Sequence, residues 1–267
     1  MARFTRFAVA IPCLCLTLTG ALPAQEIEVE VKHLISEAAA EAAFAKLNPL
    51  FPEGAINQRV CYFDTAPAGE NAKGALDKAG IILRAREKAD DDDDSTLKLR
   101  GAEGATVTGA IANSLEIEQD WTSPSKINFS RSQDDKKVKE GRFEEVMSGS
   151  KKPKSLFEKQ VPLMEEQNKG FDWGSLKRYG PLKAQLWKKV PLEGFDRKVT
   201  VEKWFLEKEG APARTLLEIS AKVKGASKEE ISIKAEAFYK AALKFETGES
   251  PAASKTSLVL DYFKPGH

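Results

Sequence analysis

Cysteine and histidine are scarce in this 267-residue sequence, which has three cysteines and two histidines. Cys13 and Cys15 lie in an apolar N-terminal segment, so Cys61 is the one cysteine of the remaining chain. A single cysteine excludes an intramolecular disulfide, and we interpret Cys61 as a small core residue. His33 lies on the apolar side of its predicted strand and His267 is terminal, so neither suits a Ser–His catalytic pair.

Motifs for nucleotides and nucleic acids are also missing. No Gly-x-x-x-x-Gly-Lys-Ser/Thr segment occurs, which excludes a P-loop nucleotide site. The 41 basic and 40 acidic residues are mixed along the chain rather than segregated, so nucleic-acid binding is not predicted. The run Asp90–Asp94 lacks the glycine and the spaced ligands of an EF-hand loop, and we interpret it as a solvated hairpin loop rather than a calcium site.

The first residues resemble an export signal. Arg3 and Arg6 precede an apolar run from Phe7 to Leu18, and small residues follow at 21–24. The apolar run is too short to span a membrane, so we expect cleavage near Ala24 and no stable membrane anchor. The protein is therefore expected to be exported, periplasmic or extracellular. The alternative for this segment is an uncleaved membrane anchor.

What the sequence does contain is strands that alternate charged and apolar residues. The run Glu26–Lys32 places its charged side chains on one face of a strand and its apolar ones on the other. The pattern recurs with basic residues in Ile82–Arg86 and Thr96–Arg100, and with acidic residues in Leu115–Glu118. If these strands share a sheet, one face of that sheet carries carboxylates opposite lysines and arginines.

Helices are expected between the strands. Ser36 and Ser227 are candidate N-caps, and Ser227 with Glu230 has the spacing of a capping box. Helices are predicted at 36–47, 71–79, 155–167 and 227–245, and strands at 26–32, 58–63, 81–88, 95–100, 115–121, 182–189, 198–207, 215–224 and 254–263.

These elements predict an α+β fold. We expect about eight strands in a closed or nearly closed antiparallel β-barrel that forms a charged tunnel, with helices packed outside. We predict a signal peptide at 1–24 and one domain at 25–267. The lysine-rich, polar stretch 123–154 is interpreted as an insertion with one exposed helix at about 134–147.

Charged side chains turned into a barrel must pair, stay hydrated or meet a ligand, because an unpaired buried charge is unfavourable. Arginine and lysine from several strands suit a phosphate chain. Glutamates among them would repel that chain unless a divalent cation joins carboxylate and phosphate oxygens, and Mg²⁺ or Mn²⁺ suits such an all-oxygen site.

The sequence resembles the CYTH family, the triphosphate tunnel metalloenzymes, which includes thiamine triphosphatases, inorganic triphosphatases and some adenylate cyclases. The match begins with a Glu-x-Glu-x-Lys signature at Glu28, Glu30 and Lys32 and extends over about residues 26–263. The later motifs follow in order: Tyr62–Thr65, Leu83–Arg86, Thr96–Lys98, Glu116 with Glu118, and Ser254 with Lys255.

The resemblance implies roles for individual residues. The signature residues Glu28, Glu30 and Lys32 become the candidate catalytic group. Metal ligation is implied for Glu28, Glu30 and Glu218, with Glu116, Glu118 and Glu202 as further acidic candidates. Phosphate binding is implied for Lys32, Arg84, Arg86, Lys98, Lys189 and Lys255, and Arg100 joins them because it shares the face of Lys98.

Together these features predict an exported metal-dependent phosphohydrolase for inorganic triphosphate, short polyphosphate or an organic triphosphate. Two features depart from the family pattern: Ser220 stands where a second glutamate is common, and 123–154 has no counterpart. They favour the alternative of a non-catalytic polyphosphate- or polyanion-binding module. Solvated faces of an open sheet, or a lipocalin-like barrel with an apolar interior, are further alternatives. The oligomeric state has no signal in the sequence.

Overall fold

The protein is described by a computed structural model that covers residues 27–52, 54–68, 73–89, 91–101, 115–123, 126–246, 251 and 253–264. The predicted signal peptide and Asp90 lie outside the described residues. Among the described residues, no helix has the length and apolar character needed to cross a membrane.

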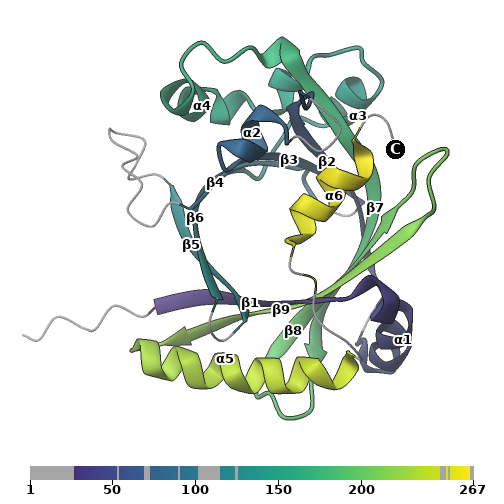
Figure 1. The fold of residues 1–267 in the computed structure, drawn as a ribbon, viewed down its shortest axis with the longest axis vertical. Coiled ribbons are helices and arrows are strands. Elements are labelled where there is room, and N and C mark those ends of the chain that lie inside the picture. Colours follow the sequence, from purple (N-terminus) through teal and green to yellow (C-terminus); the bar gives the residue numbers. More distant parts are fainter. Residues whose placement is uncertain are drawn as a thin grey trace, which may run out of the picture.

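Nine strands close into a barrel in the order β1-β5-β6-β4-β3-β2-β7-β8-β9, which is seen end-on in Figure 1. The strands are β1 (Ile27–Ile35), β2 (Ile56–Thr65), β3 (Ile81–Lys88), β4 (Asp94–Arg100), β5 (Glu116–Ser123), β6 (Lys126–Asp135), β7 (Leu176–Pro191), β8 (Lys198–Leu206) and β9 (Arg214–Gly225). The predicted barrel with helices outside is confirmed.

The barrel is mixed, which corrects the prediction of about eight antiparallel strands. Strand β1 is antiparallel to β9 but parallel to β5, and Glu30 lies beside Asp120 in the parallel pair. The ninth strand comes from the stretch read as a polar insertion, because β6 pairs with both β4 and β5. That interpretation of 123–154 is wrong for residues 126–135.

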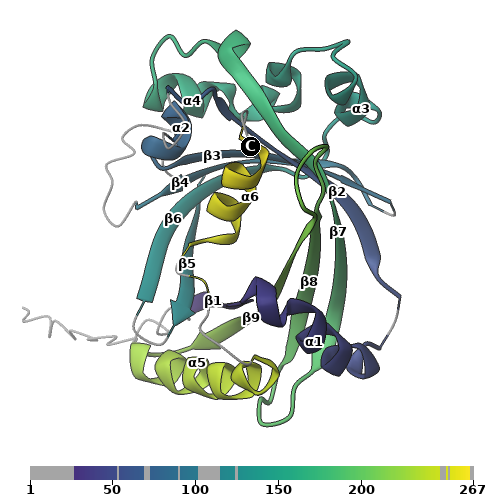
Figure 2. The same cartoon turned by 45° about the vertical axis from the view of Figure 1, so that its right-hand side comes forward.

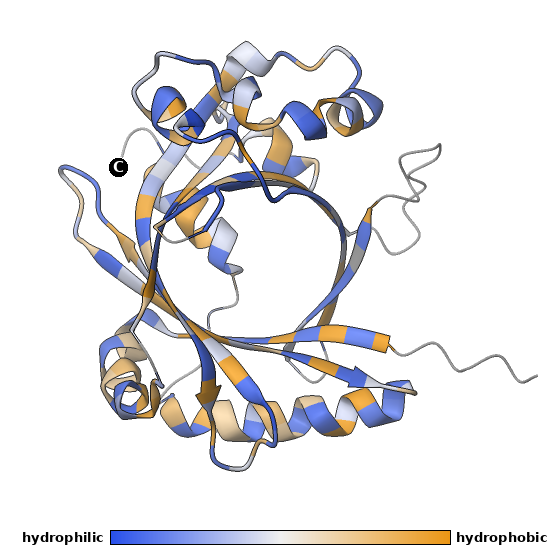
Figure 3. Ribbon diagram, turned by 180° about the vertical axis from the view of Figure 1, so that it is seen from behind, coloured by the Kyte–Doolittle hydropathy of each residue, from blue (hydrophilic) through white to orange (hydrophobic). Residues whose placement is uncertain are grey.

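The alternating pattern of β1 separates inside from outside as predicted. Val29, Val31 and Ile35 are buried on the outer side of the barrel, whereas Glu28, Glu30 and Lys32 point inward. Helices α1 (Glu37–Leu47) and α5 (Lys228–Ala242) cover this apolar outer side, and Figure 3 shows hydrophobic residues both in the helices and in the strands beside them. The predicted cap of α5 is confirmed, since the Ser227 side chain accepts a hydrogen bond from the Glu230 backbone N–H.

A second helical layer covers the opposite side of the barrel. It consists of α2 (Ala75–Lys78), α3 (Arg142–Met147) and α4 (Val161–Gln167), together with short 3₁₀ turns at Pro153–Leu156, Glu158–Gln160 and Trp173–Ser175. Its core includes Phe143, Phe157 and Leu163, packed on outward residues of β2, β3 and β4. Cys61 is buried in this core, as expected.

The C-terminal segment is a helix inside the barrel, so the predicted last strand is wrong. Helix α6 (Lys255–Phe263) lies within the ring of strands in both Figure 1 and Figure 2. The Ser254 side chain caps it by accepting a hydrogen bond from the Ser257 backbone N–H. Val259, Leu260 and Tyr262 pack against inward apolar residues of β2, β7 and β8, including Trp204. The interior therefore has an apolar part filled by α6 and a charged part.

The packing of α6 gives a first testable prediction. Val259 is fully buried between the helix and the barrel wall. Replacing it with alanine removes two buried methyl groups, and we expect the free energy of unfolding to fall by about 2 kcal/mol. Urea unfolding measures this change. Asp261→Ala, at an exposed position of the same helix, should alter stability by less than about 0.5 kcal/mol, and equal effects of the two changes would contradict this packing.

Candidate functional site

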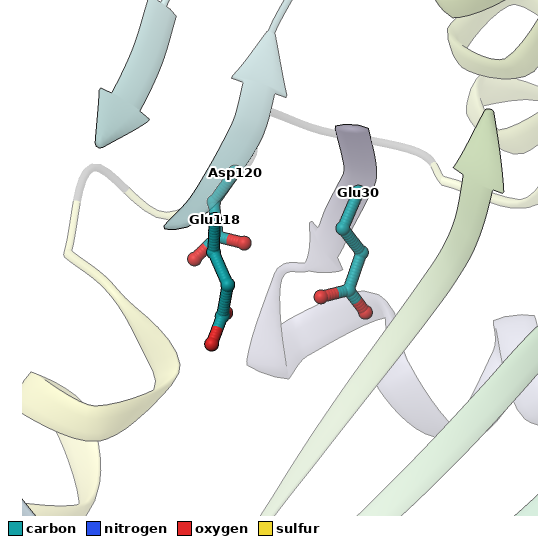
Figure 4. Close-up of side chains that lie close together, drawn as sticks. All are labelled: Glu30, Glu118 and Asp120. Atoms are coloured by element: carbon teal, nitrogen blue, oxygen red, sulfur yellow. The ribbon is translucent and has the colours of Figure 1, made fainter. Parts of the chain in front are cut away.

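Three carboxylates meet in the charged part of the interior. Glu30 comes from β1, and Glu118 and Asp120 come from β5. One oxygen of each lies within 4.8 Å of one oxygen of the others, and Figure 4 shows the three side chains facing the same space. The parallel pairing of β1 with β5 produces this arrangement, because it sets Glu30 directly beside Asp120. We call these three residues the acidic cluster.

Two lysines form ion pairs with the acidic cluster. Lys32 Nζ lies 2.9 Å from Glu30 Oε2 and 3.1 Å from Asp120 Oδ1. Lys98 Nζ lies 2.7 Å from Glu118 Oε2 and 2.9 Å from Asp120 Oδ2. The two oxygens of Asp120 thus face different lysines. All five side chains retain partial exposure, from 14% for Asp120 to 32% for Glu30, so solvent reaches the site.

These contacts decide the charge states at neutral pH. Burial alone would raise the pKa of Asp120, but Lys32 and Lys98 outweigh it and hold that pKa below its usual value. Burial likewise opposes ionisation of Glu118, whose pKa is nevertheless lowered by Lys98 and the Ser132 hydroxyl. Burial would lower the pKa of Lys32, yet Glu30, Asp120 and Glu218 raise it. These pKa shifts favour ionised Asp120 and Glu118 beside a charged Lys32.

The acidic cluster fits a divalent cation. Its donors are carboxylate oxygens on two adjacent strands, the ligand type that magnesium and manganese prefer. Two serines of β6 face the same space: Ser132 donates a hydrogen bond to Glu118 Oε1, and Ser130 stands opposite Glu118 in the strand register. Ser130 is 2% exposed and its hydroxyl has no hydrogen-bond partner among the described residues. A water or an ion bound at this position would supply the missing hydrogen-bond partner.

A second group of charges ties α6 to the barrel. Glu202 of β8 and Glu218 of β9 stand directly opposite each other, and Lys255 Nζ contacts both, at 2.6 Å from Glu218 Oε1. Lys255 also lies 4.2 Å from the centre of the Trp204 ring. Burial raises the pKa of Glu218, whereas Lys255 outweighs burial at Glu202 and lowers its pKa. Both glutamates are therefore engaged by one lysine and lie outside the acidic cluster.

Other predicted ligands are placed elsewhere. Glu28 is ion-paired with Lys222 at 2.9 Å and Lys224 at 3.1 Å, on the neighbouring strand β9. The Glu116 side chain is 66% exposed and lies 3.9 Å from Lys136. Of the six predicted metal ligands, Glu30 and Glu118 meet in the acidic cluster, whereas Glu202 and Glu218 meet at Lys255.

Some of the predicted phosphate-binding residues also lie on the inward face near the acidic cluster, and others lie elsewhere. Arg84, Arg86 and Arg100 share the inward face of β3 and β4 with Lys98. Arg84 Nη2 donates to Thr96, but its buried Nε has no partner among the described residues. Arg86 is held by Asp94 at 2.8 Å, and Arg100 Nη1 donates to the Ser254 hydroxyl at 3.2 Å. Lys189 lies exposed at a bulge of β7 with φ of 60°, and no ion pair joins it to the carboxylates described above.

Asp120 is the site residue that sequence reasoning missed. It follows Glu116 and Glu118 at the same two-residue spacing, so the alternation of β5 already placed it on their face. The resemblance to the family drew attention to the glutamate pair alone. Ser130 and Ser132 had no comparable signal, because the half of β6 that contains them, from Ser130 to Asp135, is polar on both faces.

The pairing of Asp120 predicts a pH-dependent stability. Since its folded-state pKa is lowered, its charge stabilises the fold above the unfolded value of 3.8, and this contribution is lost as the pH falls through the folded pKa. Asp120→Asn is expected to lower the free energy of unfolding by about 1–3 kcal/mol at pH 7 and by less at pH 3. Urea unfolding at both pH values measures it, and an equal loss at pH 3 would refute the assignment.

Comparisons with known proteins support the fold. No protein-family model and no curated protein matches the sequence. The structure of HpAC1 from Hippeastrum, a proposed adenylyl cyclase described as having a dominant triphosphatase activity, is similar with a TM-score of 0.50 and 20% identity, over 88% of this chain and 95% of that one. The PH1819 protein of Pyrococcus horikoshii OT3 gives a TM-score of 0.45 at 16% identity, over 88% and 99% of the two chains.

Proposed function

We propose that this protein is a metal-dependent phosphohydrolase that acts on inorganic triphosphate, short polyphosphate or an organic triphosphate inside the barrel. The observation that carries the proposal is the acidic cluster of Glu30, Glu118 and Asp120 flanked by Lys32 and Lys98. A site for a phosphate chain alone needs no carboxylates, and a site for a metal alone needs no lysines. A site that contains both carboxylates and lysines suits a ligand with both a positive metal ion and negative phosphate groups.

The fold also supports a phosphohydrolase. HpAC1, which shares this fold, is described as having a dominant triphosphatase activity. The motif order of the CYTH family runs through β1, β3, β4 and β5, the strands that line the charged part of the interior. Helix α6 fills the apolar part, so we place the phosphate chain between β1, β5, β6 and β4.

The residues have distinct roles in this proposal. Glu30, Glu118 and Asp120 would hold Mg²⁺ or Mn²⁺, which when bound neutralises phosphate charge and lowers the pKa of a coordinated water. Lys32 and Lys98 bind phosphate oxygens, and Arg84, on the same wall as Lys98, offers an Nε that has no partner among the described residues. Ser130 and Ser132 present hydroxyls that orient ligand oxygens beside Glu118.

The second candidate is a polyphosphate- or polyanion-binding module without turnover. It is favoured because Glu28 and Glu218, two of the implied metal ligands, pair with lysines elsewhere and do not join the acidic cluster. Ser220, opposite Lys32 on β9, supplies no carboxylate there. For either candidate, we propose that the protein is exported.

A hydrolysis screen distinguishes the two candidates. The purified protein is incubated with tripolyphosphate, a longer polyphosphate or ATP, each with Mg²⁺, Mn²⁺ or a chelator, and released phosphate is measured. Metal-dependent phosphate release from at least one triphosphate is expected. Tight binding of tripolyphosphate without release under any metal condition would favour the binding module instead.

A further inference from the structure

The carboxylates of the acidic cluster are already paired with lysines before any ligand arrives. Lys32 reaches Glu30 and Asp120, and Lys98 reaches Glu118 and Asp120, at distances of 2.7 to 3.1 Å. Each cluster carboxylate therefore has at least one ammonium group as its counter-ion. The five side chains come from β1, β4 and β5, and every one of them belongs to the proposed ligand site.

This pairing disfavours a free divalent cation. To bind Glu30, Glu118 and Asp120, the cation must enter between two ammonium groups that already contact the same oxygens. The like charges repel at a distance of a few ångströms, and in a half-buried site this repulsion is poorly screened. The released ammonium groups would also lose their partners.

The same pairing disfavours a free phosphate chain. A phosphate oxygen that takes Lys32 or Lys98 must compete with carboxylates in direct contact with the ammonium groups. It would then lie beside three negative charges that have lost their counter-ions. Neither ligand alone leaves every charge of the site paired.

A cation and a phosphate chain together resolve both problems. The chain takes the ammonium groups, which frees the carboxylate oxygens for the cation, and the cation contacts phosphate as well as carboxylate. The Ser130 hydroxyl is buried opposite Glu118 and has no partner in the described part of the chain, so it provides a further contact for the incoming ligand. The two ammonium groups then contact phosphate, and the cluster carboxylates contact the cation, so each of these five side chains has a counter-ion again.

We infer, building on the proposed function, that Lys32 and Lys98 are exchangeable counter-ions and that the site takes a divalent cation and a phosphate chain as one strongly coupled unit. Coupling between two ligands is reciprocal, since each raises the affinity of the other by the same factor. The expected factor lies at about 10-fold or more, within the usual range for coupled sites.

The coupling is measured without turnover. Mn²⁺ binding to the purified protein is followed by electron paramagnetic resonance, and binding of an imido-bridged, non-hydrolysable triphosphate analogue by calorimetry in chelator or in saturating Mn²⁺. Weak binding of Mn²⁺ alone and of the analogue alone is expected, with about 10-fold or tighter binding of the analogue when Mn²⁺ is present. Equal affinities with and without Mn²⁺ would overturn the inference.

Variants separate lysine exchange from simple bridging by the metal. Lys98→Met removes one counter-ion, so it should strengthen the binding of Mn²⁺ alone while it weakens the coupling. Lys32→Met is an independent second variant with the same expectation. Lys234→Met is the control, because Lys234 pairs with Glu230 on the outer helix α5, and it should change neither quantity. Unchanged or weaker binding of Mn²⁺ alone in both cluster variants would refute lysine exchange.

This test is separable from that of the proposed function. Absence of hydrolysis with the coupling intact would reject the phosphohydrolase and retain coupled binding. Metal-dependent hydrolysis without coupling would retain the enzyme and reject the exchange of counter-ions.

Discussion

Replacing Glu30 with glutamine is expected to reduce metal-dependent phosphate release by about 100-fold or more. Glutamine keeps the size of the side chain but removes its charge, and Glu30 is the contribution of β1 to the acidic cluster. Loss of residues that only support a metal ligand lowers affinity or activity by about 10–100-fold, so loss of a ligand itself should have at least the larger effect. Initial rates at saturating triphosphate measure it.

Glu28→Gln is the matched control for that change. It makes the same substitution on the same face of the same strand, two residues away, where the side chain is paired with Lys222 and Lys224 rather than with the cluster. We expect less than about a fivefold loss of rate. If Glu28→Gln is as damaging as Glu30→Gln, the metal is held by the signature glutamates together and the cluster is misplaced.

The inward direction of the signature was predictable because alternation is a local property. One residue out of step would turn Val29 and Val31 into the charged interior and Glu28 and Glu30 into the apolar layer under α1 and α5, which is unfavourable on both sides. The same reasoning placed His33 on the outer side, where it is buried and 2.7 Å from Glu246.

Alternation could not predict that Glu30 joins the acidic cluster and Glu28 does not. Which inward residues meet depends on the strand that lies alongside, and that register is set by contacts distant in sequence. Strand β9 presents Lys224 and Lys222 to Glu28 and Glu30, while β5 presents Asp120 to Glu30. Glu30 joins Glu118 because β1 and β5 are parallel neighbours. The alternating pattern within each strand does not reveal that they are neighbours.

The predictions for β6 and α6 were wrong for opposite reasons. Strand β6 has an apolar alternation only at Ile127 and Phe129, and its second half is polar on both faces, so the apolar face by which a strand is normally recognised is short. Helix α6 is rich in β-branched and aromatic residues, which favoured a strand. Its buried residues nevertheless follow helical spacing: Thr256, Val259, Leu260 and Tyr262. For this segment, the spacing of the apolar residues indicated the helix better than the residue composition did.

Helix α6 also leads to the prediction with the largest expected effect on stability. Lys255→Met removes the one lysine in contact with both Glu202 and Glu218, which face each other across β8 and β9. Two buried carboxylates then remain without their counter-ion, and we expect the free energy of unfolding to fall by about 3–5 kcal/mol at pH 7. Denaturant unfolding measures the loss, and Lys240→Met on exposed α5 is the control, with less than about 0.5 kcal/mol expected.

A second substitution tests whether charge or packing causes that loss. Glu218→Gln in the Lys255→Met background removes one of the two facing charges at constant size, so it should restore a large part of the lost stability. Lower pH should act in the same direction, because burial already raises the pKa of Glu218 and its protonation removes the same charge. A double variant as unstable as Lys255→Met at every pH would mean that Lys255 stabilises α6 through its contact with Trp204 and not as a counter-ion.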